Sequence, residues 1–362
     1  MSTTVRVALV GLGNVGRAFL DLMESKAGWL ADRYGLELVL TGAADSRGAV
    51  LDPKGINPAA LRAHKSAGKG AGEFSGGRPG MPAPKMVAGV QADFLLEAAT
   101  VNLRTGQPGL DCARTALRRG MGAVLADKGP LVHAFGELTA LAAGRETPLP
   151  AGGGVPSALA VGPAPSRLAY SATVCGALPV VNIGRRDLLA CEFVRVRGIF
   201  NSTSNFLLAA MTRGESYARA LHQAQVDGVA ETDPSLDVEG WDTANKLVII
   251  ANSILRQPAT LGDVQPVSGI TTLDPGEIRT RAAQGEIVKL IATAEWSGER
   301  YELKVEPEWL PAGDFLAQVS GWEMGIVFET DIMGVQQFKV DERGPIPTAA
   351  AMLRDLVNLA GG

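Results

Sequence analysis

The residues that could do chemistry are densest between positions 228 and 246, where five carboxylates precede one lysine. Asp242 and Lys246 are four residues apart at the start of an apolar helical pattern, so they should share one helix face. An exposed ion pair is the ordinary interpretation of this spacing, and it would contribute roughly 0.2–0.5 kcal/mol. Four aliphatic residues follow at 247–250, however. They place Lys246 at the mouth of a buried helix, where partial desolvation would suit a group that gives up and takes back a proton.

A second pattern with chemical meaning is the glycine-rich turn GLGNVG at residues 11–16. It directly follows an apolar run at 5–10 and opens a helical pattern, which is the strand, turn and helix arrangement that binds dinucleotides. There the first glycine permits a tight turn, the second lets the backbone approach a pyrophosphate, and the third lets helix and strand pack closely. The alternative is a glycine-rich turn in another kind of α/β protein, because the chain contains 44 glycines. The expected cofactor contacts here are Gly11, Gly13, Asn14, Val15 and Gly16.

Charged residues after the next apolar run, at 36–44, bear on which dinucleotide would bind. Asp45 ends that run, where an acidic residue commonly bonds the adenosine ribose hydroxyls and favours NAD. Arg47 could instead meet the 2′-phosphate of NADP, with Lys54 close enough in sequence to assist. Solvated loop charges are the ordinary alternative. The sequence therefore predicts NAD or NADP as cofactor and leaves the preference open.

The elements that must position these residues fall into two groups. Alternating strands and helices in the first group predict an α/β fold with a Rossmann-type, doubly wound parallel sheet. Its strands are expected at 5–10, 36–44, 94–98 and 123–126, with a helix at 110–119 and a glycine- and proline-rich loop at 64–84. The second group predicts an α+β domain with a mixed sheet. Its strands are expected at 193–199, 286–292 and 301–305, with helices near 206–211 and 243–251.

A chain of 362 residues is long enough for two domains, since single cores stop growing near about 250–300 residues. We expect a dinucleotide-binding domain at 1–150 and a substrate-binding and dimerisation domain at 151–320, with an insertion or linker at 147–165. The segment 321–362, which ends in an amphipathic helix at 348–359, should pack back on the first domain.

Composition narrows the class of protein. Neither a membrane-spanning run nor a secretory signal is visible, which favours a cytoplasmic enzyme. A net charge of −4 argues against a nucleic-acid partner and for a small-molecule substrate. Three cysteines and three histidines have no ligand spacing, so we expect no catalytic metal.

Taken with its neighbours, the segment at 228–246 resembles the homoserine dehydrogenase signature, in which a Gly-x-x-Glu-x-Asp-Pro run leads through an Asp and a Gly to Asp-x-x-x-Lys. Three further segments resemble that family in order and spacing, namely TVNLRTGQPG at 100–109, ADKGPL at 126–131 and GIFNSTSNF at 198–206. Asp127 stands where the family usually has asparagine. The resemblance covers nearly the whole chain.

The resemblance implies an NAD(P)-dependent dehydrogenase that interconverts L-homoserine and L-aspartate 4-semialdehyde by hydride transfer, in threonine and methionine biosynthesis. Lys246 resembles the catalytic proton carrier, Asp242 its substrate-facing partner, and Lys128 the lysine near nicotinamide and substrate. Glu231 resembles the group that meets the substrate's ammonium, supported by Asp237. The remaining positions implied are Thr203 and Ser202 for the substrate carboxylate, and Thr100, Lys128, Gly228 and Gly344 for the cofactor.

Several positions depart from the family pattern. A run GGGVP at 152–156 falls too early for the motif it resembles, and 170–179 fits better, which is why 147–165 is interpreted as an insertion. Of a glycine-rich turn near the C-terminus only Gly344 is kept, beside carboxylates that would weaken binding of an anionic cofactor. Ser171 replaces the glutamate of a monovalent-cation site, so cation binding should be weak or absent.

The family also implies a homodimer formed through the second domain's sheet. We expect the short, single-function form, without an aspartokinase segment or a regulatory domain. Two rival hypotheses stay open. One is a Rossmann oxidoreductase for another small amino acid or aldehyde, and the other is a dinucleotide-binding protein without turnover.

Overall fold

The apolar run near the start of the chain forms β1 (Thr3–Val10), the middle strand of a seven-stranded sheet in the computed structural model, which describes residues 2–145, 167–228 and 230–361. The strand order is β4-β3-β2-β1-β5-β6-β7. Parallel pairs join β1, β2 (Leu36–Asp45), β5 (Phe94–Glu97), β6 (Gly122–Leu125) and β7 (Leu168–Ala169). The predicted doubly wound parallel sheet is confirmed.

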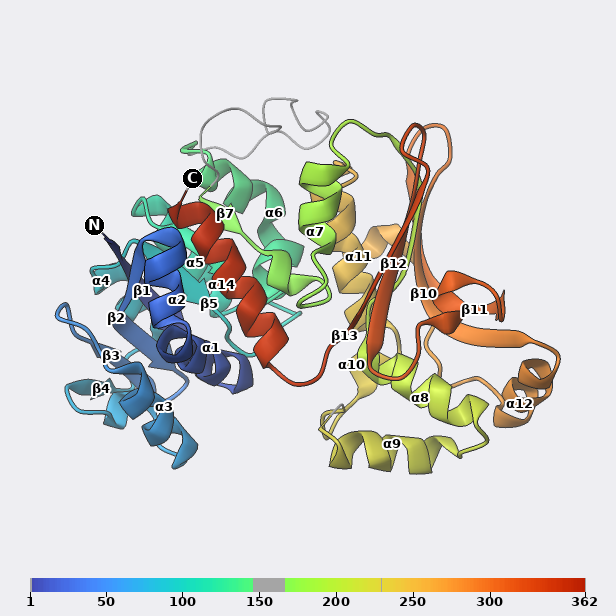
Figure 1. Cartoon of the computed structure of the whole chain (residues 1–362), viewed down its shortest axis with the longest axis horizontal. Helices are drawn as coiled ribbons and strands as arrows, with labels where there is room; N and C mark the ends of the chain where they lie inside the picture. Colours follow the sequence, from blue (N-terminus) through green and yellow to red (C-terminus); the bar gives the residue numbers. More distant parts are fainter. Residues whose placement is uncertain (1, 146–166, 229, 362) are drawn as a thin grey trace. The chain divides into compact units, whose positions relative to one another are not determined.

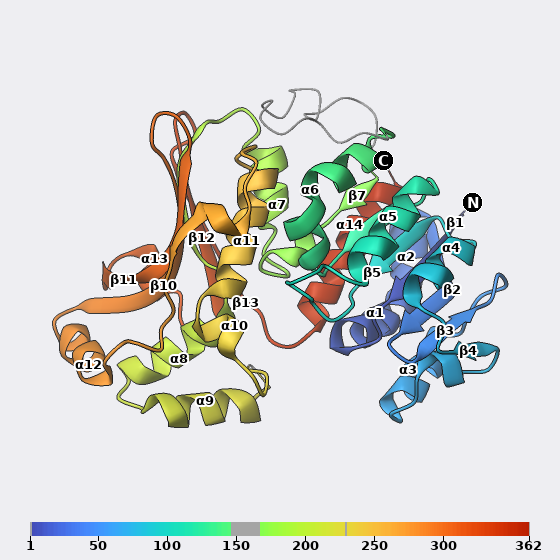
Figure 2. The same cartoon turned by 180° about the vertical axis from the view of Figure 1, so that it is seen from behind.

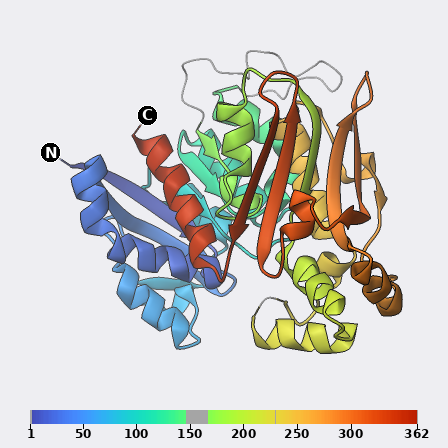
Figure 3. The ribbon, with the colours of Figure 1, turned by 45° about the vertical axis from the view of Figure 1, so that its right-hand side comes forward.

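Helices cover both faces of this sheet, because the side chains of β1 alternate between two cores. Val7 and Leu9 pack in one core with α1 (Asn14–Ser25) and α14 (Ile346–Ala360), which lie side by side (Figure 1, Figure 3). Ala8 and Val10 pack in the other core with α4 (Ala83–Gly89) and α5 (Gly109–Arg118). On this side of the sheet α5 lies against α6 (Gly129–Ala142), as the view from behind shows (Figure 2).

The strand order creates a switch point at the carboxyl edge of the sheet. β2 lies on one side of β1, whereas β5, the next parallel strand along the chain, lies on the other. Connections therefore leave β1 and β5 in opposite directions, and the crevice outside their carboxyl ends is where doubly wound sheets bind ligands.

The expected loop at 64–84 is more structured than its composition suggests. It contains the end of α3 (Pro58–Ser66), a short 3-10 turn and β4 (Gly77–Pro79), which pairs antiparallel with β3 (Gly48–Leu51). Glycine makes this possible, because a Cβ on Gly72 would lie 2.6 Å from the Cα of Pro79. Earlier in the chain, α2 (Ala27–Tyr34) lies between α1 and β2.

The second half of the chain forms a six-stranded sheet in the order β13-β12-β8-β10-β11-β9. Its pairs are antiparallel except β9 with β11, so the predicted mixed sheet is confirmed. The strands are β8 (Phe193–Ile199), β9 (Val264–Val267), β10 (Glu286–Trp296), β11 (Tyr301–Pro311), β12 (Glu323–Thr330) and β13 (Val335–Asp341).

Two helices of this half carry the residues of chemical interest and pack against β10. They are α8 (Ser202–Thr212) and α11 (Trp241–Ser253). Nearly all of α11 is buried, from Asp242 to Ala251. The shorter or more peripheral helices are α7 (Val180–Asn182), α9 (Tyr217–Val226), α10 (Ser235–Val238), α12 (Pro275–Ala283) and α13 (Phe315–Gln318).

The chain divides into two units, Met1–Gly176 with Pro345–Gly362 and Ala177–Gly344. The boundary expected at 150 and the insertion expected at 147–165 lie outside the described residues. The segment 321–362 is shared, since β12 and β13 belong to the second unit's sheet while α14 packs in the first unit's core.

Candidate functional site

The glycine-rich turn lies at the carboxyl end of β1 and has the geometry that a pyrophosphate requires. Gly11 has a φ of +91°, and a Cβ there would lie 2.2 Å from the carbonyl oxygen of Ala98. A Cβ on Gly16 would lie 1.9 Å from the carbonyl oxygen of Gly11, so helix and turn touch through backbone alone. At Gly13 the space a Cβ would fill is open. Because Gly13 precedes α1 and offers no capping side chain, the first turn of α1 can present N–H groups to an anion.

The two residues that open α1 are also at this turn. Asn14 is exposed and its Oδ1 accepts a hydrogen bond from Arg17 Nη2 at 2.8 Å, while Val15 is half-buried. Arg17 was not among the expected contacts. It places a cation one turn into the helix that follows the expected pyrophosphate site.

Asp45 ends β2 as expected, but its carboxylate is already engaged. Oδ2 accepts hydrogen bonds from Lys65 Nζ and from the N–H of Ala71, and Oδ1 accepts from the N–H of Arg47 at 2.8 Å. Burial alone would raise the pKa of Asp45, but the bonds from Lys65 and the two N–H groups outweigh it and hold the pKa below its usual value. Asp45 is thus a firmly ionised group with little acceptor capacity left for ribose hydroxyls.

Two cations flank this carboxylate. Lys65, on α3, forms the ion pair with Asp45, and the guanidinium of Arg47 donates to the carbonyl of Gly68 at 2.5 Å and lies 3.7 Å from Glu73. Lys54 was the assisting cation expected from the sequence. Lys65 was not expected, because it is twenty residues beyond Asp45 and on a separate helix.

The segments after β5 and β6 carry the other expected contacts of the first unit. Thr100 is exposed in the loop that follows β5, and Lys128 is the residue that precedes α6. Beneath them lie two buried carboxyl groups, Glu97 at the end of β5 and Asp127 after β6, which are 0% and 1% exposed.

The densest polar network of the second unit surrounds Lys246. Its Nζ donates to Asp242 Oδ2 at 2.7 Å and to the carbonyl of Phe200 at 2.5 Å. Lys246 is 9% exposed and Asp242 is 7% exposed, so the exposed ion pair that the spacing alone would suggest is not what forms. The aliphatic run after Lys246 explains the difference, because it buries the helix face that both side chains share.

Asn201 joins this pair to a second carboxylate. Its Nδ2 donates to Asp242 Oδ2 at 2.8 Å and to Asp237 Oδ1 at 2.6 Å, while its Oδ1 caps α8 by accepting from the N–H of Ser204. Burial and the neighbouring charge of Asp242 raise the pKa of Asp237, opposed by Asn201, Lys246 and Thr203. Asn201 was missed as a site residue, although it lies inside the recognised segment 198–206, because an uncharged amide carries no chemistry by itself.

The remaining expected residues of the second unit are less enclosed. Glu231 is exposed and its carbonyl oxygen accepts from Gln225 Nε2, and Ser202 is half-buried at the first position of α8. Gly228 and Gly344 both have positive φ, +74° and +72°. The carboxylates expected to weaken cofactor binding near Gly344 have partners of their own. Asp341 Oδ2 lies 3.1 Å from Arg343 Nη2, and Glu342 accepts from the N–H of Ala177 at 2.9 Å.

Ser171, at the expected cation position, is bound by a carboxylate. Its hydroxyl and N–H donate to Asp355 at 2.6 and 2.8 Å, and Arg354 Nη2 donates to its hydroxyl at 2.7 Å. Among the described residues, no three or more His, Cys, Asp or Glu side chains gather as they would around a metal ion. Over the same ranges, no helix has the length and apolarity to cross a bilayer.

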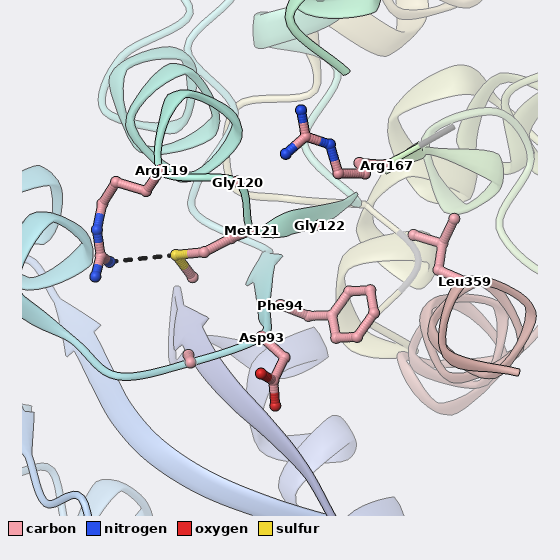
Figure 4. A pocket seen from close by; sticks show the side chains of 9 residues that line it. Asp93, Phe94, Arg119, Gly120, Met121, Gly122, Arg167 and Leu359 are labelled. Atoms are coloured by element: carbon pink, nitrogen blue, oxygen red, sulfur yellow. Dashed lines mark hydrogen bonds between the residues drawn. The ribbon is translucent and has the colours of Figure 1, made fainter. Parts of the chain in front are cut away.

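A cavity of about 310 Å³ opens at the opposite edge of the first sheet (Figure 4). It lies at the amino ends of β5 and β6 and is lined by Asp93, Phe94, Arg119, Met121, Arg167 and Leu359, among others. Arg119 is occupied, since its guanidinium donates to the carbonyls of Val87 and Val90 at 2.5 and 2.8 Å. Because the cavity lies at the amino ends of β5 and β6, it is at the opposite edge of the sheet from the glycine-rich turn.

Comparison with known proteins gives one consistent family. Residues 179–357 match the family model described as homoserine dehydrogenase. The chain is 32% identical over 355 residues to a homoserine dehydrogenase of Methanocaldococcus jannaschii, covering 98% of each chain. It is 31% identical over 360 residues to an NAD(+)-dependent homoserine dehydrogenase of Pseudomonas canavaninivorans, covering 99% of this chain and 96% of the other. A crystal structure from Archaeoglobus fulgidus, assigned to homoserine dehydrogenase, superposes with a TM-score of 0.83 at 34% identity and covers 99% of this chain and 100% of the other.

Proposed function

This chain belongs to the homoserine dehydrogenase family, and on that premise we propose that the network around Lys246 carries the proton transfer of the reaction. The enzyme is an NAD(P)-dependent oxidoreductase that interconverts L-homoserine and L-aspartate 4-semialdehyde. The observation that carries the proposal is the buried Lys246–Asp242 pair, which Asn201 joins to Asp237.

The first unit fits the dinucleotide. The open space at Gly13, the backbone contact of Gly11 with Gly16 and the uncapped start of α1 form a cradle for a pyrophosphate. Thr100 and Lys128 belong to the two segments that leave the carboxyl edge of the sheet beside the switch point. A dinucleotide held there would supply the hydride acceptor for oxidation of the carbinol carbon and the hydride donor for the reverse reduction.

Lys246 handles the proton that accompanies the hydride. In oxidation the neutral amine accepts the hydroxyl proton of homoserine, and in reduction the ammonium donates a proton to the carbonyl oxygen of the semialdehyde. Asp242 and the carbonyl of Phe200 both accept hydrogen bonds from Nζ, so they fix its position and stabilise the ammonium form. Lys128 is proposed to assist near the reacting carbon.

The amino acid part of the substrate needs groups of both signs. We assign its ammonium to Glu231 and Asp237, and its carboxylate to Ser202 and Thr203 in the first turn of α8. A helix N-terminus favours an anion, which supports the second assignment. Asn201 takes the role of a positioning residue that sets the distance between Asp237 and Asp242.

The surroundings of Asp45 favour NADP over NAD. The carboxylate that would bind the ribose hydroxyls of NAD is occupied by Lys65 and two N–H groups, while Lys65 and Arg47 supply two cations beside it. Cations at this position suit the 2′-phosphate that distinguishes NADP.

Three further parts of the proposal rest on family membership. They are a cytoplasmic location, a role in threonine and methionine biosynthesis, and a homodimer formed through the second unit's sheet. A sedimentation measurement at several protein concentrations tests the last, with a monomer at all of them as the contrary result.

The enzyme assay follows absorbance of the reduced nicotinamide when the protein is given L-homoserine and NAD or NADP at alkaline pH. Reduction of either dinucleotide that requires L-homoserine is expected. If only another small amino acid supported reduction, the substrate assignment would be wrong and the dehydrogenase assignment would stand.

A further inference from the structure

Glu97 and Asp127 form a pair of buried carboxyl groups that the proposed reaction does not use. They lie at the carboxyl ends of two neighbouring parallel strands. Glu97 is the last residue of β5 and is in register with Leu125 of β6, and Asp127 follows Leu125 by two residues. Glu97 Oε1 accepts from the N–H of Ala99 at 2.9 Å, and Asp127 Oδ1 accepts from the N–H of Gly129 at 2.9 Å. Each carboxyl group thus anchors backbone next to an expected cofactor contact, Thr100 in one case and Lys128 in the other.

The second oxygen of each group is buried without a partner among the described residues, namely Glu97 Oε2 and Asp127 Oδ2. The two carboxyl groups also lie close together in the fold. A Cβ on Gly109, the first residue of α5, would lie 2.8 Å from Asp127 Oδ2 and 3.1 Å from Glu97 Oε1. Only a residue without a side chain leaves room for both. Two ionised carboxylates so close to each other, with unpartnered oxygens, would repel each other at high cost.

Burial and the charge of Asp127 raise the pKa of Glu97 to about 8. Burial also raises the pKa of Asp127, to about 6, and the N–H of Gly129, Lys128 and His133 oppose that rise. Between these values one carboxyl group is neutral and the other is ionised. The neutral one then has an O–H to donate, and the ionised one has an oxygen to accept it, so one shared proton would join the two groups.

From this geometry we infer that Glu97 and Asp127 hold one shared proton at neutral pH and in that state position Thr100 and Lys128 for the dinucleotide. The inference rests on the proposed function, because it takes these two residues as cofactor contacts. Glu97 carries the proton, and its O–H donates a hydrogen bond to the Asp127 carboxylate. When alkali removes it, like charges face each other beneath the loop that connects β5 to α5, and the backbone that they anchor moves to separate them.

The charged and titratable groups around the pair come from two elements. From α5 these are Cys112, whose thiol pKa is raised by burial and by the charges of Glu97 and Asp111, and Asp111 itself. From the start of α6 they are Lys128 and His133, and His133 Nε2 is bonded to the carbonyl of Leu103 at 2.8 Å in the loop above. This hydrogen bond links the loop to α6.

The test is the pH dependence of dinucleotide affinity in the full chain. If only the singly protonated pair binds well, a pKa of about 8 predicts that the dissociation constant for NADPH rises about tenfold between pH 7 and 9. Fluorescence titration at constant ionic strength measures it without substrate, so it is independent of whether homoserine turns over.

Two variants isolate the pair. Glu97→Gln and Asp127→Asn each keep a backbone acceptor and supply a permanent N–H donor to the remaining carboxylate. In both, affinity should stay within about twofold over this pH range. Asp111→Asn is the matched control, since it removes an exposed carboxylate from the neighbouring helix α5, and it should keep the tenfold loss.

Three results would overturn the inference. The first is a wild-type affinity that is flat from pH 7 to 9, and the second is an alkaline loss that persists in Glu97→Gln and in Asp127→Asn. The third is restoration of affinity at pH 9 by saturating sodium or potassium, which would mean that a cation rather than a proton joins the carboxylates. Because there are two variants, failure of one to fold still leaves the other as a test.

Discussion

Replacing Lys65 by glutamine should shift the dinucleotide preference of this enzyme away from NADP. Lys65 and Asp45 form an ion pair whose side chains are only 11% and 9% exposed. Glutamine keeps most of the stem of the lysine but removes its charge. The 2′-phosphate of NADP would then lose one of its two expected cations, whereas NAD has no group at that position to lose one.

The magnitude follows from the contact. A hydrogen bond to a charged group contributes roughly 1.5–3 kcal/mol, and each 1.4 kcal/mol is tenfold in affinity. The dissociation constant for NADP should therefore rise about 10- to 100-fold. That for NAD should stay the same or fall, because Asp45 regains an acceptor site for a ribose hydroxyl. Asp45 itself keeps the N–H groups of Arg47 and Ala71, at 2.8 and 3.0 Å, so the ionised carboxylate is not left without partners.

The assay is a calorimetric titration of both dinucleotides, at one ionic strength, into wild-type protein, Lys65→Gln and the control Lys69→Gln. Lys69 is exposed, lies four residues further on, and loses the same charge. Thermal unfolding of the three proteins shows whether loss of the buried pair has disturbed the fold. The reasoning would be refuted if NAD and NADP weakened in parallel, or if Lys69→Gln matched Lys65→Gln.

Four other substitutions have defined outcomes. Lys246→Ala should lower kcat by about 100-fold or more, since a positioned acid or base raises the reaction rate by roughly 10² to 10⁴. The dissociation constant for the dinucleotide should stay near that of the wild type. Retained turnover would mean that Lys246 has only a structural role. Asn201→Ser can still cap α8 but cannot bridge Asp237 and Asp242. We therefore expect kcat/KM for homoserine to fall about tenfold or more, and an unchanged value would remove Asn201 from the site. Burial lowers the pKa of Lys289 to about 8, below its unfolded value of 10.5. The free energy of unfolding of the wild type, relative to that of Lys289→Met, should therefore rise between pH 8 and 10.5. Chemical denaturation measures this difference, and a difference that stays constant with pH would contradict the prediction. Ser171→Glu would place a second carboxylate against buried Asp355 and should cost about 2–4 kcal/mol of stability, so an unchanged unfolding midpoint would argue against the contact.

The last of these revises an expectation drawn from the sequence. With Ser171 considered alone, a glutamate there should create or strengthen a dependence on sodium or potassium. The structure adds Asp355, which already supplies a negative charge at this position and accepts both of the donors that Ser171 offers. The expected effect of the substitution is therefore repulsion within the first unit.

Local patterns predicted the elements well, because periodicity and glycine placement report directly on strand, turn and helix. The run before Gly11 and the aliphatic residues after Lys246 each place a side chain on a known face of one element. That is why the glycine-rich turn and the burial of the Lys246 face could be expected from the sequence. The structure in the glycine-rich stretch at 64–84 was underestimated, because close backbone approach leaves no hydrophobic pattern to detect.

Contacts between distant segments could not be found in this way. Lys65 reaches Asp45 from another helix, Asn201 reaches Asp242 across forty-one positions, and Ser171 meets Asp355 across 184. Each depends on how elements pack and not on any spacing along the chain. The pairing of buried carboxyl groups is of the same kind, since two strand ends become neighbours only when the sheet is assembled.

The division of the first unit into two pieces of chain determines when each unit can fold during synthesis. Met352 and Leu356 of α14 are fully buried in the core that packs on β1, so this core is incomplete until residues 346–360 have left the ribosome. The second unit is one continuous stretch, and its last strand ends at Asp341, before α14 begins. During translation the second unit can therefore fold while the dinucleotide-binding core is still incomplete, and a nascent chain stalled shortly before residue 345 would expose an apolar surface that chaperones recognise.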